Sequence, residues 1–283
     1  MNALVTDRIL ANLSIRTAES FRERVEAAAA AGFDAIGLGL AQYREHKAEG
    51  MAPREMVAIL DDNGIALTEI EVLVGFAVGG RAGGSERYPF LKYATPEDEL
   101  EFFEMATTFG VRHMQTIGTF DSPLEPDAAE RFAGLCDRAA EHGLLVALEF
   151  VPESSVPDAS VAARIIRDAD RPNGGVCLDA WHHFRGANDE ALLRELPADK
   201  VFLLQLCDGT MVPEDDDFLN DTLHNRRVPG QGEFVLPALF RVVGEMGVSA
   251  PASLEVISDE LDALGAFGAA KALGGCLEHY RID

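Results

Sequence analysis

Short apolar runs alternate with helical segments along almost the whole chain, and this alternation restricts the fold more than any other feature of the sequence. Each run has the length and continuous hydrophobicity of a buried strand. Eight such runs are present, at residues 9–15, 33–40, 65–74, 111–117, 145–150, 175–179, 200–206 and 252–257. Repeated strand–helix units build a parallel sheet, because each helix returns the chain to the edge where the next strand begins. Eight units without a linker predict an α/β fold, a single (β/α)8 TIM barrel over residues 1–283.

The segments between the strands carry helix signals. Helical patterns occupy residues 21–31, 53–63, 96–110, 126–142, 161–168, 189–196, 233–246 and 261–279. Thr17 or Ser20 is a candidate N-cap of the first pattern, and Gly64 follows the end of the second. Two polar loops, 75–96 and 213–232, are long, and the first of them has the length of a lid or a substrate wall. A doubly wound open sheet is the alternative fold, but no GxGxxG turn follows the first strand.

The composition restricts the partners of this chain. Of 283 residues, 48 are Asp or Glu and 24 are Lys or Arg, which leaves a formal net charge of −24. Nucleic-acid binding depends on cationic side chains that neutralise phosphates, so we expect no nucleic-acid partner. The apolar runs are much shorter than the roughly 20 residues that span a membrane, and the first residues lack the pattern of a secretory signal. Four cysteines without CxxC spacing favour a reducing, cytoplasmic location.

Four predicted strands in the second half of the chain end on or near an oxygen-bearing side chain. These residues are Glu149, Asp179, Gln205 and Glu255. In a TIM barrel the C-terminal ends of the strands surround the site of chemistry. A carboxylate buried without a partner is costly, so four ordinary strand-end residues would need four separate partners. One shared divalent cation satisfies all four, because carboxylate and amide oxygens are the ligands of hard ions.

Several segments of the same half resemble a known family. They are LEFVP, LDAWHHFRG, LQLCDG, NRRVPGQGE and SLEVIS. They resemble the xylose isomerase-like TIM barrels called sugar phosphate isomerases/epimerases, most strongly over about residues 140–260. That group includes ketose 3-epimerases, hydroxypyruvate isomerase and enzymes of inosose metabolism. The resemblance implies a divalent metal ion and a small carbohydrate-type substrate.

The family places metal ligands on strands five to eight, in the order Glu, Asp, His or Gln, Glu. This order carries over onto Glu149, Asp179, Gln205 and Glu255. Gln205 stands where many epimerases have histidine, as it does in hydroxypyruvate isomerase-like members. The difference is compatible with metal binding but weakens the transfer of any one substrate. Oxygen ligands favour Mn²⁺ as the cofactor, with Mg²⁺ or Co²⁺ as alternatives.

This ligand set predicts proton transfer next to a carbonyl group. A divalent ion that chelates a carbonyl oxygen and an adjacent hydroxyl oxygen stabilises an enediolate, so the neighbouring proton becomes removable. In the family's epimerases, two ligand glutamates lie on opposite faces of the substrate, and one removes the proton that the other returns. The resemblance assigns these catalytic roles to Glu149 and Glu255, without a direction.

Four residues are candidates for substrate binding. His182 matches the family's Asp-x-x-His and is expected to bind a substrate oxygen, with a packed loop histidine as the alternative. Arg226 matches the family's R-x-x-P-G-x-G segment, and its guanidinium group is suited to a hydroxyl or carboxylate group. Glu71 either lines the pocket or is a solvated strand end. Trp181 either stacks on a sugar ring or forms an apolar wall.

These predictions describe a metal-dependent isomerase or epimerase of a sugar, keto-sugar or keto-polyol. The alternative is a lyase on the same enolate chemistry, either an inosose or dehydroshikimate dehydratase or a 3-keto C-glycoside deglycosidase with a small second subunit. An AP-endonuclease-like member would use more histidine ligands and a basic DNA track, which 7 histidines and a charge of −24 do not support. A barrel that serves only as a binding subunit would have no need of four metal ligands. A homo-oligomer is compatible with all of these.

Overall fold

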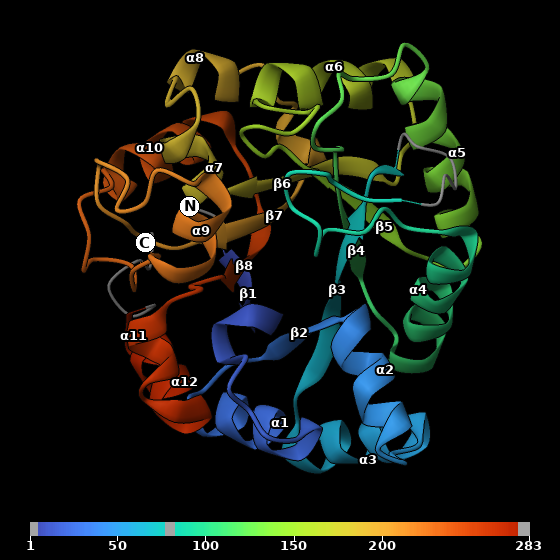
Figure 1. Ribbon diagram of the computed structural model, residues 1–283, viewed down its shortest axis with the longest axis vertical. Helices are drawn as coiled ribbons and strands as arrows, with labels where there is room; N and C mark the ends of the chain where they lie inside the picture. Colours follow the sequence, from blue (N-terminus) through green and yellow to red (C-terminus); the bar gives the residue numbers. More distant parts are fainter. Residues whose placement is uncertain (1–4, 77–82, 277–283) are drawn as a thin grey trace.

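The eight strands pair in chain order and close into one barrel (Figure 1). The computed structural model describes residues 5–76 and 83–276. All neighbouring strands are parallel, including the pair of β1 and β8 that closes the barrel. The strands are β1 Val5–Leu10, β2 Ala35–Gly39, β3 Ala66–Val74, β4 His113–Ile117, β5 Leu145–Glu149, β6 Gly174–Asp179, β7 Val201–Leu206 and β8 Ala250–Leu254. The predicted (β/α)8 architecture is confirmed, whereas the extent of the domain over 1–283 stays a prediction.

Helices form the outer layer around the barrel (Figure 1). They are α1 Phe21–Ala30, α2 Leu40–Ala48, α3 Pro53–Asn63, α4 Pro96–Phe109, α5 Ala128–Ala140, α6 Ala159–Ala169, α7 Ala180–Arg185, α8 Glu190–Leu193, α9 Phe218–His224, α10 Leu236–Met246, α11 Asp259–Asp262 and α12 Gly265–Cys276, with the short 3-10 helices η1 Asn12–Ile15 and η3 Ala198–Lys200. Their apolar faces pack on the strands and form one continuous core. Within the described ranges, no helix has both the length and the hydrophobicity to cross a membrane.

The predicted helix signals lie at the observed helix ends. Ser20 accepts a hydrogen bond from the backbone N–H of Glu23 at 3.1 Å, so Ser20, not Thr17, is the N-cap of α1. Gly64 follows the last residue of α3 with φ 65°, a left-handed conformation that glycine adopts without strain. Local sequence therefore determines these two boundaries.

Three short helices were missed by the sequence patterns. α2 and α7 begin directly after β2 and β6, and α9 lies inside the loop predicted over 213–232. They contain 9, 6 and 7 residues, too few to display a clear apolar period. The predicted helix over 261–279 is divided into α11 and α12, and its residues after 276 lie outside the described part of the chain.

The first and last strands are shorter at their C-terminal ends than predicted. β1 ends at Leu10, and the chain then turns into η1. β8 ends at Leu254, so Glu255 is the first residue after the strand. Both boundaries lie at the mouth of the barrel, where the chain leaves the sheet to form loops.

α7 and α9 are joined at the C-terminal end of the barrel by a buried ion pair. Arg185 of α7 donates Nε to Oδ2 of Asp221 at 2.7 Å, and both side chains are at most 3% exposed. Trp181 of α7 donates its indole N–H to Oγ1 of Thr222 at 2.9 Å. These contacts hold α9 in place, although α9 has neither the length nor the amphipathic pattern to be stable alone.

We predict that Asp221→Ala lowers the free energy of unfolding by about 3–5 kcal/mol, because the charge of Arg185 then stays buried without its partner. Glu245→Ala is the control, because it removes only exposed contacts with Arg194 and Arg241. It should cost less than about 1 kcal/mol. Urea unfolding followed by circular dichroism measures both values, and equal losses would contradict the prediction.

Candidate active site

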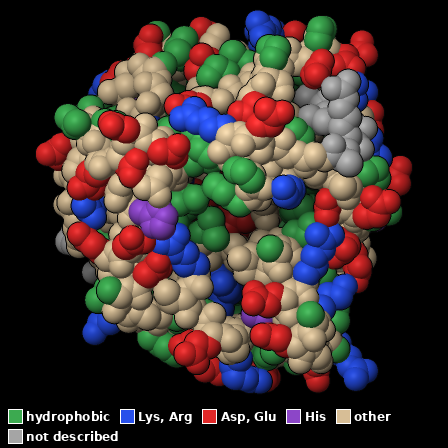
Figure 2. Space-filling model, viewed as in Figure 1, with side chains coloured by type: hydrophobic (Ala, Val, Ile, Leu, Met, Phe, Trp, Pro, Cys, Tyr) green, Lys and Arg blue, Asp and Glu red, His purple; other side chains and the backbone are tan. Residues whose placement is uncertain are grey.

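A cavity of about 410 Å³ opens at the C-terminal ends of the strands. Its walls come from β3, β4 and β5, from the residues after β1 and β8, from α2 and α9, and from the loop before α4. Figure 2 shows it as a hollow near the centre of this face, with hydrophobic side chains beside it. A cavity of this size is suited to a small-molecule ligand.

Two carboxylates and an imidazole lie together at the ends of β5 and β6. Glu149 and Asp179 are the last residues of their strands. Asp179 also caps α7, because its Oδ1 accepts a hydrogen bond from the backbone N–H of Trp181 at 2.8 Å. One helical turn later, Nε2 of His182 lies 3.2 Å from Oε1 of Glu149 and 3.5 Å from Oδ2 of Asp179. His182 is therefore a helical residue of the site, not a loop histidine.

Arg226 joins the remaining carboxylate to this group. Its Nη1 donates to Oδ2 of Asp179 and to Oε2 of Glu255, each at 2.9 Å. Its Nε donates to the backbone carbonyl of Thr222 at 3.2 Å, which orients the guanidinium group. The side chain is 1% exposed and lines the cavity. The buried guanidinium group of Arg226 thus forms ion pairs with two of the predicted metal ligands.

Gln205 lies beside this group and does not line the cavity. Its Nε2 donates to Oε1 of Gln115 at 3.2 Å, and its Oε1 accepts from the thiol of Cys177 at 3.1 Å. The residue is fully buried in β7. The structure places Gln205 next to Asp179 through the register of β6 and β7. Its role as a metal ligand stays a prediction.

Trp181 does not line the cavity, and its expected stacking on a sugar ring stays a prediction. Its side chain is fully buried, and the guanidinium carbon of Arg185 lies 4.2 Å from the centre of the ring. Phe234 packs beside it with ring centres 5.8 Å apart. The reason is that α7 begins directly after β6, which points Trp181 into the packing between α7 and the loops. The alternative of an apolar wall is closer to what is observed.

Burial dominates the electrostatics of these side chains. Burial and then the charge of Asp179 raise the pKa of Glu149 to about 8. Burial raises the pKa of Glu255 well above the usual value, against the lowering effect of Arg226. It lowers the pKa of His182 to about 4, so this imidazole is neutral at pH 7. Each shift follows mainly from burial, which disfavours the charged form of every one of these side chains.

The donor set fits a divalent cation. Oxygens of Glu149 and Asp179 and a nitrogen of His182 lie within 4.8 Å of one another, and all three side chains are buried. Nδ1 of His182 is buried and has no hydrogen-bond partner among the described residues. Clustered carboxylates with a neutral imidazole are suitable ligands for Mn²⁺, Mg²⁺, Co²⁺ or Zn²⁺.

The loop predicted over 75–96 supplies one wall of the cavity. Phe90 and Lys92 line the cavity, and Lys92 forms an antiparallel bridge with Gly84. Tyr88 fixes this wall, because it is 4% exposed and its hydroxyl donates to Oε2 of Glu153 at 3.0 Å. Residues 77–82 of the predicted loop lie outside the described part of the chain. The described part forms one wall of the cavity, and its role as a substrate wall stays a prediction.

Among the polar residues of the cavity that the sequence analysis missed, three are uncharged. Asn12, Gln42 and Thr222 line it together with Glu71, which was expected there. A polar residue inside the first apolar run was the available sign for Asn12. Gln42 and Thr222 lie on α2 and α9, the short helices that the patterns did not reveal.

The barrel with these side chains on its later strands matches a known family. A family model described as a xylose isomerase-like TIM barrel matches residues 25–275. The chain belongs to the xylose isomerase-like TIM barrel family. A solved structure described as the IolI protein with a zinc atom superimposes with a TM-score of 0.82 and covers 97% of both chains. At 20% identity, this similarity shows a shared fold.

Curated relatives within the xylose isomerase-like family are enzymes. A 3-dehydroshikimate dehydratase from Pseudomonas putida is 27% identical over 247 residues, which is 84% of this chain. An inosose isomerase from Bacillus subtilis is 29% identical over 166 residues, which is 56% of this chain and 58% of that protein. The matched region spans only 36% of the length of the dehydratase. Similarity therefore supports an enzyme without deciding between dehydration and isomerisation.

Glu69 is another buried carboxyl residue, two positions before Glu71 on β3 and deeper in the barrel. Glu69 accepts a hydrogen bond from Oγ of Ser253 at 2.9 Å, and its Oε2 is 3.6 Å from Nε2 of His113. Gly37 leaves room for it, because a Cβ there would clash with Oε1 of Glu69. Burial raises the pKa of Glu69 to about 7 and lowers that of His113 to about 3. The folded protein therefore favours the protonated form of Glu69.

We predict that Glu69→Gln changes stability in a pH-dependent way. The pKa of Glu69 rises from 4.5 to about 7 on folding, so its contribution is fully present below pH 4.5 and decreases as the pH rises through 7. Relative to the wild type, the variant should therefore gain about 3 kcal/mol between pH 4.5 and 7. Urea unfolding in the presence of a chelator, at several pH values, measures this difference. A difference that does not vary with pH would contradict the raised pKa.

Proposed function

We propose that this protein is a divalent-metal-dependent enzyme that removes a proton next to a carbonyl group of a small, carbohydrate-like substrate and then eliminates water. The observation that carries the proposal is the group of buried carboxyl side chains around the cavity. Glu149, Asp179 and Glu255 come from successive parts of the barrel mouth, and Arg226 is the guanidinium group that contacts two of them. We infer that these three carboxylates, with Gln205, hold the cation.

The side chains of the site have different roles in this proposal. A divalent cation supplies polarisation of the substrate carbonyl, which makes the adjacent C–H bond acidic. Glu149 faces the cavity beside a neutral imidazole, and a bound cation would offset the burial that raises its pKa, so that Glu149 would remove the proton as a carboxylate. Glu255 is held by Arg226, whose charge acts against the effect of burial on the pKa of this carboxyl group. His182 can donate its ring N–H to a substrate oxygen, because burial keeps it neutral.

The cations of the cavity favour a substrate that carries a carboxylate. Arg44, Lys92 and Arg226 line the cavity. The two arginines already form ion pairs with acidic side chains. Lys92 forms no ion pair with any described residue, although the chain has twice as many acidic as basic side chains. 3-Dehydroshikimate carries a carboxylate and an inosose does not, so this lysine supports dehydration of a substrate of the first type.

Isomerisation of an inosose or ketose is the second candidate. The similarity to inosose isomerase favours it. Proton removal next to a carbonyl is common to both reactions, and they differ in whether the enolate is reprotonated or loses a hydroxyl group. The same purified protein can therefore be tested for both outcomes.

We predict that the protein with added Mn²⁺ eliminates water from 3-dehydroshikimate and contains one Mn²⁺ per chain. Glu149→Gln should lower kcat/KM by about 10²- to 10⁴-fold, because it removes the base. It should also weaken Mn²⁺ binding, because it removes a ligand. Ultraviolet absorption of the aromatic product measures the rate, and elemental analysis measures the metal.

Glu26→Gln is the control for this experiment, because Glu26 lies on α1 and contacts only Arg22 at 3.5 Å among the described residues. It should keep both activity and metal. Deuterium incorporation into inosose in D₂O, without elimination from 3-dehydroshikimate, would favour the second candidate. A metal-loaded wild type that neither exchanges a proton nor eliminates water from these substrates would contradict the proposal.

We predict that Lys92→Met raises KM for 3-dehydroshikimate about fivefold, which corresponds to about 1 kcal/mol for one exposed charge pair. The value of kcat should change little, because the contact is made equally in the ground state and the transition state. Lys271→Met, an exposed substitution on α12, is the control. An unchanged KM in steady-state kinetics would show that Lys92 does not bind the carboxylate.

A further inference from the structure

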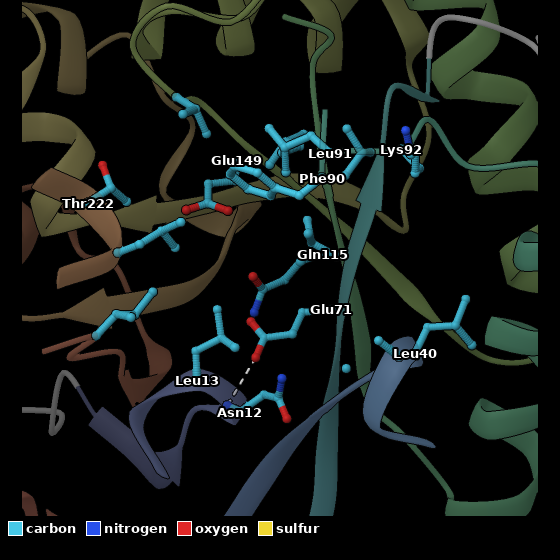
Figure 3. Close-up of a pocket in the computed structure, with 18 of the residues that line it drawn as sticks. Asn12, Leu13, Leu40, Glu71, Phe90, Leu91, Lys92, Gln115, Glu149 and Thr222 are labelled. Carbon is cyan, nitrogen blue, oxygen red and sulfur yellow. Dashed lines mark hydrogen bonds between the residues drawn. The ribbon is translucent and has the colours of Figure 1, made fainter. Parts of the chain in front are cut away.

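A carboxyl group stands apart from the predicted metal ligands on another wall of the cavity. Glu71 lies near the C-terminal end of β3, lines the cavity and is 7% exposed. Figure 3 shows its carboxyl group pointing into the cavity beside Gln115, with Glu149 on a different wall. The sequence analysis offered Glu71 as a residue that binds substrate, but its surroundings fit a more specific role.

One oxygen of Glu71 is held by the protein. Oε1 accepts a hydrogen bond from the backbone N–H of Asn12 at 3.0 Å (Figure 3). Asn12 is fixed in turn, because Arg24 donates Nη1 to its carbonyl oxygen at 2.6 Å and its Nδ2 donates to Gln42 at 3.2 Å. Among the described residues, no side chain or backbone group forms a hydrogen bond with Oε2 of Glu71. This oxygen is therefore available to a ligand in the cavity.

The charges around Glu71 favour its protonated form. Glu69 on the same strand and Glu149 on β5 are both acidic, and Glu255 also acts on it from beyond β8. Burial, then Glu69 and Glu149, raise the pKa of Glu71 to about 8, while the Asn12 N–H and Arg24 act in the opposite direction. At pH 7 the group is a neutral carboxylic acid, and it can donate a proton.

We propose that Glu71 is the general acid of the reaction and protonates the hydroxyl group that leaves the substrate. This inference rests on the proposed dehydration. Glu149 takes the proton from carbon, and the electron pair of that C–H bond forms the carbon–carbon double bond. The C–O bond breaks, and the oxygen takes the proton of Glu71 and leaves as water. Glu149 then loses its proton and Glu71 regains one by exchange with solvent, so no oxidant or reductant is needed.

If Glu71 is the general acid, its removal should slow the loss of the hydroxyl group but not the removal of the α proton. The other possible roles of Glu71 do not predict this difference. Removal of the α proton requires the base and the polarised carbonyl, whereas loss of hydroxide requires an acid. If Glu71 only bound the substrate, its removal would weaken both steps equally. If it were the base, its removal would abolish proton exchange. The ratio of the two rates therefore identifies its role.

The test compares the metal-loaded wild type with Glu71→Gln on 3-dehydroshikimate in D₂O. Nuclear magnetic resonance measures deuterium next to the carbonyl in recovered substrate, and ultraviolet absorption measures elimination. We expect elimination to decrease about 10²- to 10⁴-fold, as is typical for loss of a general acid. Deuterium exchange should be retained, and the metal content should stay the same.

Two further measurements make the outcome decisive. Glu71→Asp keeps an acidic proton and should recover elimination at least tenfold relative to Glu71→Gln. An analogue with fluoride in place of the leaving hydroxyl group should reduce the defect of Glu71→Gln, because fluoride leaves without protonation. Both variants keep a polar side chain of similar size, and thermal unfolding checks that they fold.

Three results would overturn the inference. Equal loss of exchange and elimination would assign Glu71 to binding or to proton removal. Unchanged elimination in Glu71→Gln, with a competent wild type, would show that the leaving group needs no acid from this side chain, and the proposed function would survive. A wild type that exchanges the α proton without elimination would overturn dehydration and this role together.

Discussion

The central constraint on this structure is the negative charge buried at the mouth of the barrel. Glu149, Asp179 and Glu255 are each less than 10% exposed, and one guanidinium group, that of Arg226, contacts two of them. Burial of carboxylates is costly unless cations compensate them. The pKa of Glu149 is raised mainly by burial and then by the charge of Asp179, which reflects this cost. A divalent cation would compensate this charge, so the electrostatics of these side chains support the proposed chemistry.

The loops and short helices at the mouth of the barrel hold these charged side chains in fixed positions. Asp179 caps α7, and this places His182 within 3.5 Å of Asp179 itself. Arg185 and Asp221 then hold α9 against α7, so that the backbone of α9 orients Arg226. The ion pair of Arg185 and Asp221 joins the segments that follow β6 and β7, whereas the other contacts lie within one such segment. The catalytic end of the barrel is thus fixed by packing between its loops, in addition to the sheet beneath it.

Much of the fold and part of the candidate site could be predicted from sequence. Local hydrophobic patterns predict the strands and most of the longer helices. They also predict the positions of Glu149 and Asp179, because the end of an apolar run marks the end of a strand. The side-chain direction of Trp181 could not be predicted, since it depends on α7, a helix of 6 residues. The contacts of Arg226 with two carboxylates depend on the order of the strands in the sheet, because β6 and β8 lie on either side of β7, and Arg226 lies in the loop after β7.

The sequence by itself determined that this chain is a (β/α)8 barrel with oxygen-bearing side chains at the ends of its later strands. The period of the apolar residues and the spacing of the predicted strands carry this information, because both depend only on neighbours along the chain. The tertiary structure alone decided which of these side chains face a common cavity. Glu71, Asn12 and Lys92 meet there from three distant segments, while Trp181 is turned away. Such groupings arise from the closed sheet and the packing of its loops, which no local pattern encodes.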